Sequence, residues 1–257
     1  MTRPRFYVFM FQISVGLTYL FLMTAAIGQS TQQSGAVTVE DFDRIHMQGD
    51  LHIVLEPQPT RIAAEAETKN EIEIHEAADE SGVSLINVEV VDGTLYLEAF
   101  EEHSNSARQP RVVVRYSTPL RELVAHDFQT VSGQIWSADQ FALEGHGHGR
   151  FELRDLLAKG LAVECSGETN VHISGEVEVQ SVNLSGRNQY HAAALRTGAT
   201  QIRASGNNIF ALHSRDWLDV DVHGSAVVSY LGNPWIYKTI VGDTRLFRLP
   251  EHRTTAL

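Results

Sequence analysis

The fold is decided by three related segments, CSGETNVHI (165–173), LSGRNQYHA (184–192) and ASGNNIFAL (204–212). Each carries a small residue before a glycine and then continues into a short apolar strand. EGHGHGRFEL (144–153) and VHGSAVVSY (222–230) extend the series in both directions. The steps are 20, 19, 20 and 18 residues when the segments are anchored on Gly147, Gly167, Gly186, Gly206 and Gly224. A fixed period of this size is typical of solenoids, in which each turn buries its apolar side chains against its neighbours.

The same register predicts which side chains face inward. The position four residues after each anchor is apolar or aromatic throughout: Phe151, Val171, Tyr190, Phe210 and Val228. Positions six after, four before and two before the anchors are nearly all apolar or small, and they alternate with polar ones. Alternation with period two indicates strands, and its recurrence in each segment predicts parallel ladders in register. The anchors suit corners that need a positive φ or leave no room for a Cβ.

These patterns predict an all-β protein, a right-handed parallel β-helix with turns of about 20 residues. Residues 37–247 are expected to form one domain, less regular over 37–120 and clearly repeated over 121–247, followed by a tail at 248–257. An antiparallel sandwich is the alternative, but it gives no reason for aligned columns at this period. Cys165 falls in an inward column and is expected to be a small core residue.

The part before the clear repeats is also rich in strands. Asp92-Gly93 lies between two apolar alternating runs, which is a strong hairpin signal. The acidic stretch Thr68–Gly82 and the polar stretch Glu101–Pro110 are interpreted as surface loops.

Residues 1–28 have the features of a signal peptide. Arg3 and Arg5 precede an apolar run from Phe6 to Met23, and Ala26 and Gly28 occupy the −3 and −1 positions if cleavage falls before Gln29. An uncleaved membrane anchor is the alternative, since the run approaches the length of a spanning helix. Residues 29–36 are interpreted as a polar leader. Both alternatives predict an exported chain that is periplasmic, outer-membrane-associated or extracellular and touches the membrane only through this segment.

Composition narrows the class of partner. The chain is 43% hydrophobic, as in ordinary globular proteins, and its formal charge is −12. Removing residues 1–28 leaves 18 basic against 32 acidic residues, a charge of −14, which argues against nucleic acid as a partner. With one cysteine, no intramolecular disulfide or cysteine-based metal site can form within the chain.

Histidines and acids supply candidate metal ligands. Five residues after the anchors, an outward column contains Glu152, His172 and His191, which are suitable for Zn²⁺. His146 and His148 form an H-x-H pair that could also capture a metal. The alternative in both cases is a solvated polar surface.

Glu144 and Glu164 fall on neighbouring turns, where they either splay into water or share a Ca²⁺ ion. No cofactor is predicted beyond these Zn²⁺ or Ca²⁺ possibilities. Common enzyme motifs, such as G-x-S-x-G, H-E-x-x-H and the P-loop, do not occur, and no catalytic residue is assigned.

The chain resembles the bacterial putative auto-transporter adhesin, head GIN domain family over about residues 38–247. The resemblance rests on F-x-x-I-x-x-x-G-D-x-x-I from Phe42 to Ile53, and on VVDGTLYL (90–97) before a V-x-V-x-Y strand. It also rests on recurring Ser-Gly pairs and on a closing Y-x-G-x-P at Tyr230–Pro234. The family's S-G-S/A-G repeat is altered here, for example to GHGHG at 145–149. The resemblance implies an exported β-helix without established catalytic residues.

We therefore expect a non-enzymatic extracytoplasmic module that acts in adhesion, scaffolding or envelope assembly. Its partner would be an envelope protein or glycan, and self-association into a homo-oligomer is possible. One alternative is a carbohydrate-binding or carbohydrate-active β-helix, a lyase or hydrolase. Another is metal or small-ligand binding through the histidine and glutamate column. Trp235, near the last turn, is expected to cap the open end of the core, with sugar stacking as the alternative.

Overall fold

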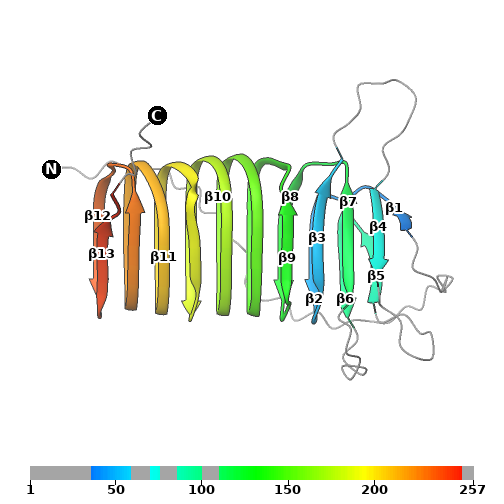
Figure 1. Ribbon diagram of the computed structural model, residues 1–257, viewed down its shortest axis with the longest axis horizontal. Coiled ribbons are helices and arrows are strands. Elements are labelled where there is room, and N and C mark those ends of the chain that lie inside the picture. The colour runs from blue at the N-terminus through cyan, green and yellow to red at the C-terminus, as the bar shows by residue number, and fades with distance from the viewer. Residues whose placement is uncertain (1–35, 59–69, 76–85, 100–109, 251–257) are drawn as a thin grey trace, which may run out of the picture. The chain divides into compact units, whose positions relative to one another are not determined.

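The computed structural model describes residues 36–58, 70–75, 86–99 and 110–250, in which every regular element is a strand (Figure 1). The strands are β1 (Ala36–Val39), β2 (Arg44–Gln48), β3 (His52–Pro57), β4 (Asn70–His75), β5 (Ile86–Val91), β6 (Thr94–Ala99), β7 (Arg111–Tyr116), β8 (Leu120–His126), β9 (Thr130–Gln134), β10 (Ser137–Gly186), β11 (Gln189–Leu231), β12 (Trp235–Val241) and β13 (Thr244–Arg248). No helix in this described part has the length and apolarity to cross a bilayer. The signal peptide predicted at 1–28 lies outside the described residues, and so do positions 101–109 of the predicted Glu101–Pro110 loop.

The expectation of a parallel β-helix over 37–247 is wrong as a class. The described strands form one 13-stranded sheet of mixed order, β1-β4-β7-β3-β9-β10-β8-β2-β6-β5, in which β11 pairs with β10, and β12 and β13 pair with β11. Three pairings at the N-terminal end are antiparallel: β1 with β4, β4 with β7, and β5 with β6. The sheet curls around a single core in a barrel-like manner, so the period of the later segments does not describe the whole chain.

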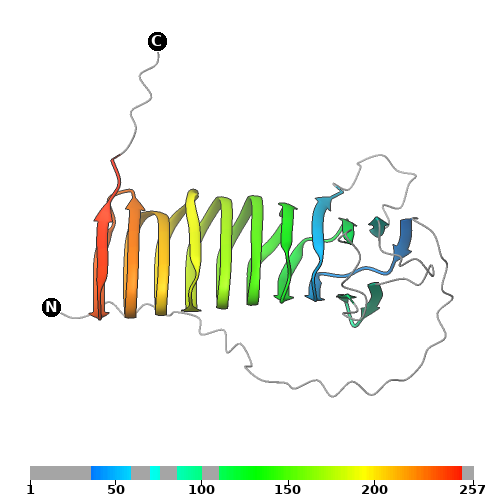
Figure 2. The same ribbon diagram turned by 60° about the horizontal axis from the view of Figure 1, so that its bottom comes forward.

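All the other pairings among the described strands are parallel, and between β10 and β11 they follow the register expected from the glycines. Val171 pairs with Tyr190, and Gly186 pairs with Gly206. Both strands are long because they turn corners without losing their ladder, so successive passes lie side by side (Figure 2). We call residues 137–231 the wound section and each pass of the chain a layer.

Two walls of the sheet run the length of the described body. The first wall comprises the segments that precede the glycine corners, with β5 at one end, then β6, β2, β8 and passes of β10 and β11, and β12 at the other end. The second wall follows the corners and runs from β1 through β4, β7, β3 and β9 to β13.

The corner between the walls is a column of glycines with positive φ. Gly147, Gly167, Gly186 and Gly206 have φ values of 82°, 97°, 102° and 86°. A Cβ added at Gly167 would overlap the carbonyl oxygen of Gly147, and the same relation repeats at the following corners. Both reasons expected for glycine here, a left-handed backbone and the absence of space, are confirmed.

The core is one continuous cluster of side chains that runs between the walls. Phe151, Tyr190 and Phe210 are each 0% exposed, as their shared column predicted. Cys165 is buried, and burial raises the pKa of its thiol to about 12. The side chain is therefore a neutral packing group in the core, as expected.

The N-terminal strands bear out one prediction and correct another. Asp92 and Gly93, both at positive φ, form the turn of the antiparallel β5–β6 hairpin, as expected. The stretch Thr68–Gly82 was predicted to be a loop, but β4 lies within it, with Ile72 fully buried. Its alternating NEIEIH sequence is a strand pattern that the surrounding acidic residues obscured.

Candidate functional site

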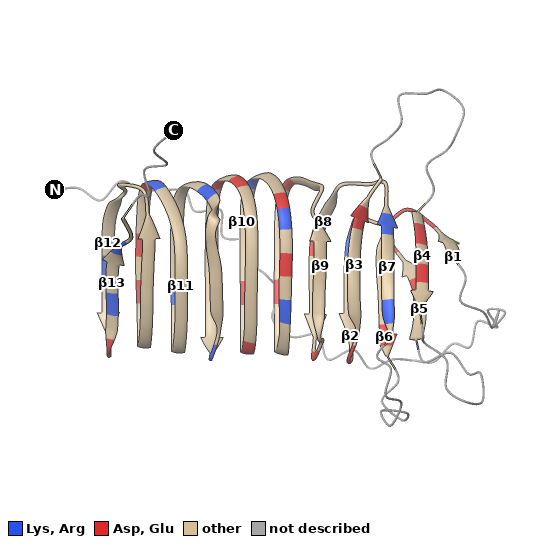
Figure 3. Ribbon diagram, viewed as in Figure 1, with Lys and Arg blue, Asp and Glu red and all other residues tan. Residues whose placement is uncertain are grey.

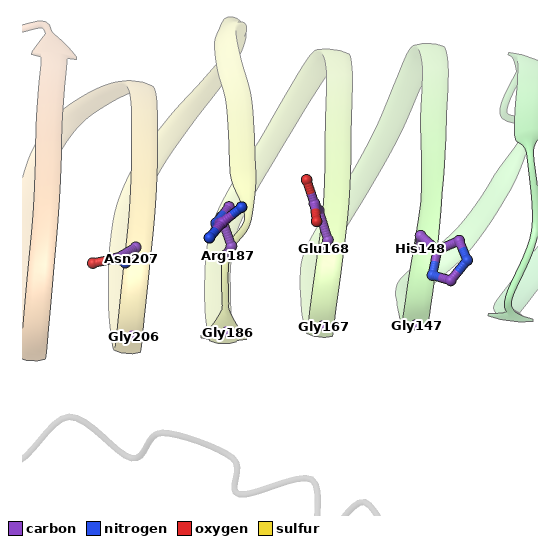
Figure 4. Close-up of a pocket in the computed structure, with 8 residues that line it drawn as sticks. All are labelled: Gly147, His148, Gly167, Glu168, Gly186, Arg187, Gly206 and Asn207. Carbon is purple, nitrogen blue, oxygen red and sulfur yellow. The ribbon is translucent and has the colours of Figure 1, made fainter.

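An open groove of about 510 Å³ follows the glycine column across four layers. Its floor is Gly147, Gly167, Gly186 and Gly206, and one polar side chain rises beside each: His148, Glu168, Arg187 and Asn207. Figure 4 shows these four side chains coming from consecutive layers and pointing outward. We call this the glycine groove. Because the floor lacks Cβ atoms, backbone groups are accessible at intervals of about 4.8 Å, the spacing of the ladder.

Buried asparagines hold this corner from behind. The side-chain oxygen Oδ1 of Asn188 accepts a hydrogen bond of 3.0 Å from the backbone N–H of Thr169, and Oδ1 of Asn208 accepts one of 3.2 Å from the backbone N–H of Asn188. Each asparagine also donates to the carbonyl of the serine three residues before it, Ser185 or Ser205. These bonds fix the corner backbone, so the exposed residues next to it are held at regular positions.

A second polar cluster lies on the first wall, over β2, β8 and the start of β10. The rings of His126 and His146 stack with centroids 4.8 Å apart, and His146 Nδ1 lies 2.8 Å from Ser166 Oγ. His146 Nε2 is 3.6 Å from a Glu144 carboxylate oxygen. One strand further along, His46 Nε2 and Glu122 Oε1 are 2.6 Å apart. We call this group the histidine face.

The pKa values of the groups in the histidine face shift in different directions. The interaction with the Glu144 carboxylate raises the pKa of His146, whereas burial and the nearby His146 lower the pKa of His126. The hydrogen bond from His46 lowers the pKa of Glu122. The face therefore combines a readily protonated histidine with a stacked neighbour that prefers to stay neutral.

The H-x-H pair does not act as a unit. Gly147 turns the corner between its two histidines, so His146 is half-buried on the wall while His148 is exposed in the groove. His148 Nδ1 lies 3.7 Å from Asp127 Oδ1. The two rings therefore contact different neighbours.

The outward column on the second wall is partly assembled. His172 and His191 pair across neighbouring layers, and their rings stack with centroids 4.5 Å apart. Glu152 is instead engaged by Arg150, at 3.1 Å. Burial, followed by the nearby His172, lowers the pKa of His191.

Within the described ranges, no group of three or more His, Cys, Asp or Glu side chains is arranged to hold a metal ion. The structure places Glu144 beside His146, and Glu164 contributes to the electrostatic environment of the same ring. The Zn²⁺ and Ca²⁺ hypotheses stay predictions, which calorimetric titration with each ion would test.

Sequence reasoning named His126 only as a possible acid/base group, and it missed that His46, Glu122 and His126 gather in the histidine face. His126 pairs with His146 twenty residues later, so extending the glycine register one step backward would have found it. His46 and Glu122 are 76 residues apart, and no local period connects them.

A family model described as "Putative auto-transporter adhesin, head GIN domain" matches residues 41–234. No curated protein is significantly similar in sequence. Among solved structures, a putative adhesin from Bacteroides fragilis is similar with a TM-score of 0.66 and 19% identity, covering 84% of this chain and 93% of its own.

Two Parabacteroides structures are similar over the same share of the chain. A putative lipid binding protein from P. distasonis has a TM-score of 0.59 and 18% identity, with 96% of that chain covered. A putative adhesin from P. merdae has a TM-score of 0.57 and 14% identity, with 95% of that chain covered. At these identities, the likeness establishes a shared fold.

Proposed function

The chain belongs to the putative auto-transporter adhesin, head GIN domain family, and from that premise we propose that it is an exported, non-enzymatic adhesion module. Its binding surface is the glycine groove, and its ligand is an extended polar polymer of the cell envelope, a glycan or a protein segment. The observation that carries the proposal is the repetition of one exposed polar side chain per layer beside an accessible backbone floor.

The chemistry of the groove favours a polymer over a small molecule. Small-molecule sites are usually enclosed and mostly apolar, so that they surround the ligand. The glycine groove is open, and its side chains offer an imidazole, a carboxylate, a guanidinium and an amide in succession. Each contact with such a group is worth little alone, so affinity requires a ligand long enough to meet several layers at once.

Rigidity supports the same role. The Asn188 and Asn208 bonds and the glycine column hold the four side chains on ordered backbone. A preorganised surface avoids part of the entropic cost of ordering on binding. Such a surface suits adhesion, which requires many weak contacts held at fixed spacing.

The test is binding of the purified chain to immobilised envelope glycan and, separately, to envelope protein extract, measured by biolayer interferometry. The variant Glu168→Ala/Arg187→Ala removes one acid and one base from the groove. We expect it to weaken binding about tenfold, since two exposed charged contacts worth about 0.5–1 kcal/mol each together approach the 1.4 kcal/mol that corresponds to a factor of ten.

The matched control is Glu178→Ala/Arg196→Ala, which also removes one acid and one base, but outside the groove. If both variants weaken binding to the glycan or the protein extract equally, or if neither variant changes binding, the result would contradict a role for the groove. Competition with soluble glycan fragments then separates a glycan ligand from a protein ligand.

A further inference from the structure

The two ends of the sheet differ in charge and both leave strands with an open edge. At the C-terminal end, β12 and β13 pair only with β11 among the described strands. At the other end, β5 pairs only with β6, and β1 only with β4. Figure 1 shows these two pairs of edge strands at opposite ends of the described body. Open edges carry unpaired N–H and C=O groups that can accept another strand.

Within the described part of the chain, the last layer also leaves apolar surface uncovered. Leu218 is 0% exposed, whereas its partner in the last layer, Ile236, is 38% exposed. Trp235 is 78% exposed, so it does not cap the core as expected. Tyr237, Val241 and Phe247 are also exposed in this layer. Uncovered aromatic and aliphatic side chains at an open strand edge are typical of an interaction surface.

Charge distinguishes the two ends. Lys238 stands in β12 at the position that Val220 occupies in the preceding layer, and Arg245 and Arg248 lie in β13. Neither Lys238 nor Arg245 forms an ion pair with any described residue. Figure 3 shows basic residues on β13 and acidic residues on β4 at the opposite end. The C-terminal end is therefore basic, although the whole chain has a charge of −12.

The N-terminal edge strands carry the opposite charge. Glu89 is exposed in β5 and Asp92 follows it, while Glu40 and Asp41 are exposed directly after β1. Neither edge strand contains Lys or Arg.

We infer that the basic C-terminal end docks onto the acidic N-terminal end of a second copy of this chain, head to tail. In a coaxial stack, β12 meets the partner's β5, and β13 meets the partner's β1, because each pair closes the same wall. The lengths correspond: seven residues against six in the first wall, and five against four in the second.

Strand direction and charge agree wall by wall. The first-wall joint is antiparallel, since β5 runs opposite to β6, and it places Lys238 and Glu89 near the middles of their strands. The second-wall joint is parallel, since β1 is related to β7 by two antiparallel pairings. Arg248 then lies at the same end as Glu40 and Asp41. Docking of two identical C-terminal ends would instead oppose Lys238 and Arg245 with like charges.

A head-to-tail contact of this kind leaves a free end on each side, so it propagates into open filaments. The inference goes beyond the proposed function, because it concerns the ends of the sheet and not the groove. It would array copies of the glycine groove along one axis.

Sedimentation velocity of the full chain over a range of concentrations tests the inference. We expect a series of oligomers whose size grows with protein concentration and shrinks as salt rises from about 50 mM to about 500 mM, because the paired charges are exposed. Lys238→Glu/Arg245→Glu and Glu40→Lys/Glu89→Lys should each lower the association constant about tenfold or more, since like charges then face each other.

The decisive experiment is to mix the two charge-reversed variants and measure their association. The acidified C-terminal end of one variant now complements the basic N-terminal end of the other, and their two remaining ends keep the unchanged complementary charges, so the mixture should regain the concentration-dependent oligomers that each variant alone has lost. Circular dichroism melts of both variants establish that they fold, and Glu168→Ala/Arg187→Ala should associate like the unchanged chain.

Three results would overturn the inference. One is a chain that stays monomeric at its highest soluble concentration, and another is association that neither charge reversal weakens. The third is a Trp235→Cys variant that cross-links to itself through identical ends. Groove binding that persists in a monomeric chain would leave the proposed function intact, so the two failures can be told apart.

Discussion

The wound section and the N-terminal strands build the same two walls by different routes. In the wound section, neighbours in a wall are about twenty residues apart, as with Val171 and Tyr190. In the N-terminal section, β1 to β9, the chain returns to insert strands between others. For example, β2 lies between β6 and β8, so that Arg44 pairs with both Thr94 and Glu122.

This difference explains why the sequence of one section shows a period and that of the other does not. A wall built from consecutive passes must repeat its inward residues at a fixed step. A wall built from interleaved strands needs only alternation within each strand, and its order is decided by packing. The glycine column nevertheless extends into the N-terminal section, where Gly49 has φ of 93° and its amide donates to the His126 carbonyl.

The largest expected effect tests the register of the wound section. Phe210→Ala should lower the free energy of unfolding by about 3–5 kcal/mol, because it leaves a cavity in a fully buried column. Its neighbour Ile209 is 44% exposed, and Ile209→Ala should cost less than about 1 kcal/mol. Urea denaturation of both variants measures the difference, and similar losses would contradict the register.

A second substitution compares the glycine column in the two sections. Gly186→Ala should cost about 3 kcal/mol, since it combines a positive φ with overlap against the Gly167 carbonyl. Gly49→Ala should cost less, about 1–2 kcal/mol, because its Cβ would lie 3.0 Å from the Ala99 Cβ and 3.1 Å from the Ala99 carbonyl oxygen, which are tight contacts but not the overlap found at Gly186. Gly160→Ala, which meets only the end of the Gln140 side chain, is the control. Thermal melts in which Gly49→Ala destabilises the chain more than Gly186→Ala would contradict this prediction.

A third substitution tests the asparagines of the wound section. Asn188→Ala removes the acceptor of the buried Thr169 amide, so we expect a loss of about 2 kcal/mol. Asn207→Ala, at the exposed position beside Asn208, is the matched control and should be near neutral. Hydrogen exchange at the Thr169 amide should accelerate in the first variant only; unchanged exchange there would refute the role of Asn188.

The smallest expected effect concerns the long-range pair of the N-terminal section. Because the pKa of Glu122 is lowered in the folded chain, the carboxylate stabilises the fold above its unfolded pKa near 4.5. That stability is lost as pH falls through the folded pKa. Glu122→Gln should therefore cost up to about 1 kcal/mol at neutral pH, and the difference should vanish in acid. Denaturation midpoints compared at neutral and acidic pH measure it, and a constant difference would argue against the pair.

The predictable features were those with a local cause. The inward columns, the positive φ of the corner glycines and the Asp92-Gly93 hairpin follow from steric limits and alternation within a few residues. The class was predicted wrongly because a period present in 144–230 was extended to strands that lack it. The strand β4 was missed although its alternation is local, because the acidic residues around it favoured the interpretation as a loop; the bonds from its buried Asn70 to Asp41 and Ser117 join distant positions that no local pattern connects.

The candidate sites also contain features that a local pattern predicts and features that it does not. The stacked His172 and His191 were predictable from one step of the period, and so was the glycine floor of the groove. The engagement of Glu152 by Arg150 and the separation of His146 from His148 depend on rotamers and on a corner, which alternation alone does not specify.

The burial of side chains in the wound section and the positions of its turns can be predicted from the amino-acid pattern, because both depend on nearest neighbours and on the sterics of glycine. The mixed strand order, the antiparallel N-terminal edge and the contact of His46 with Glu122 depend instead on how distant strands pack together. Strands distant in sequence can pair at the same edges, and the most stable pairing is the one that closes one common core. That choice is a property of the whole chain.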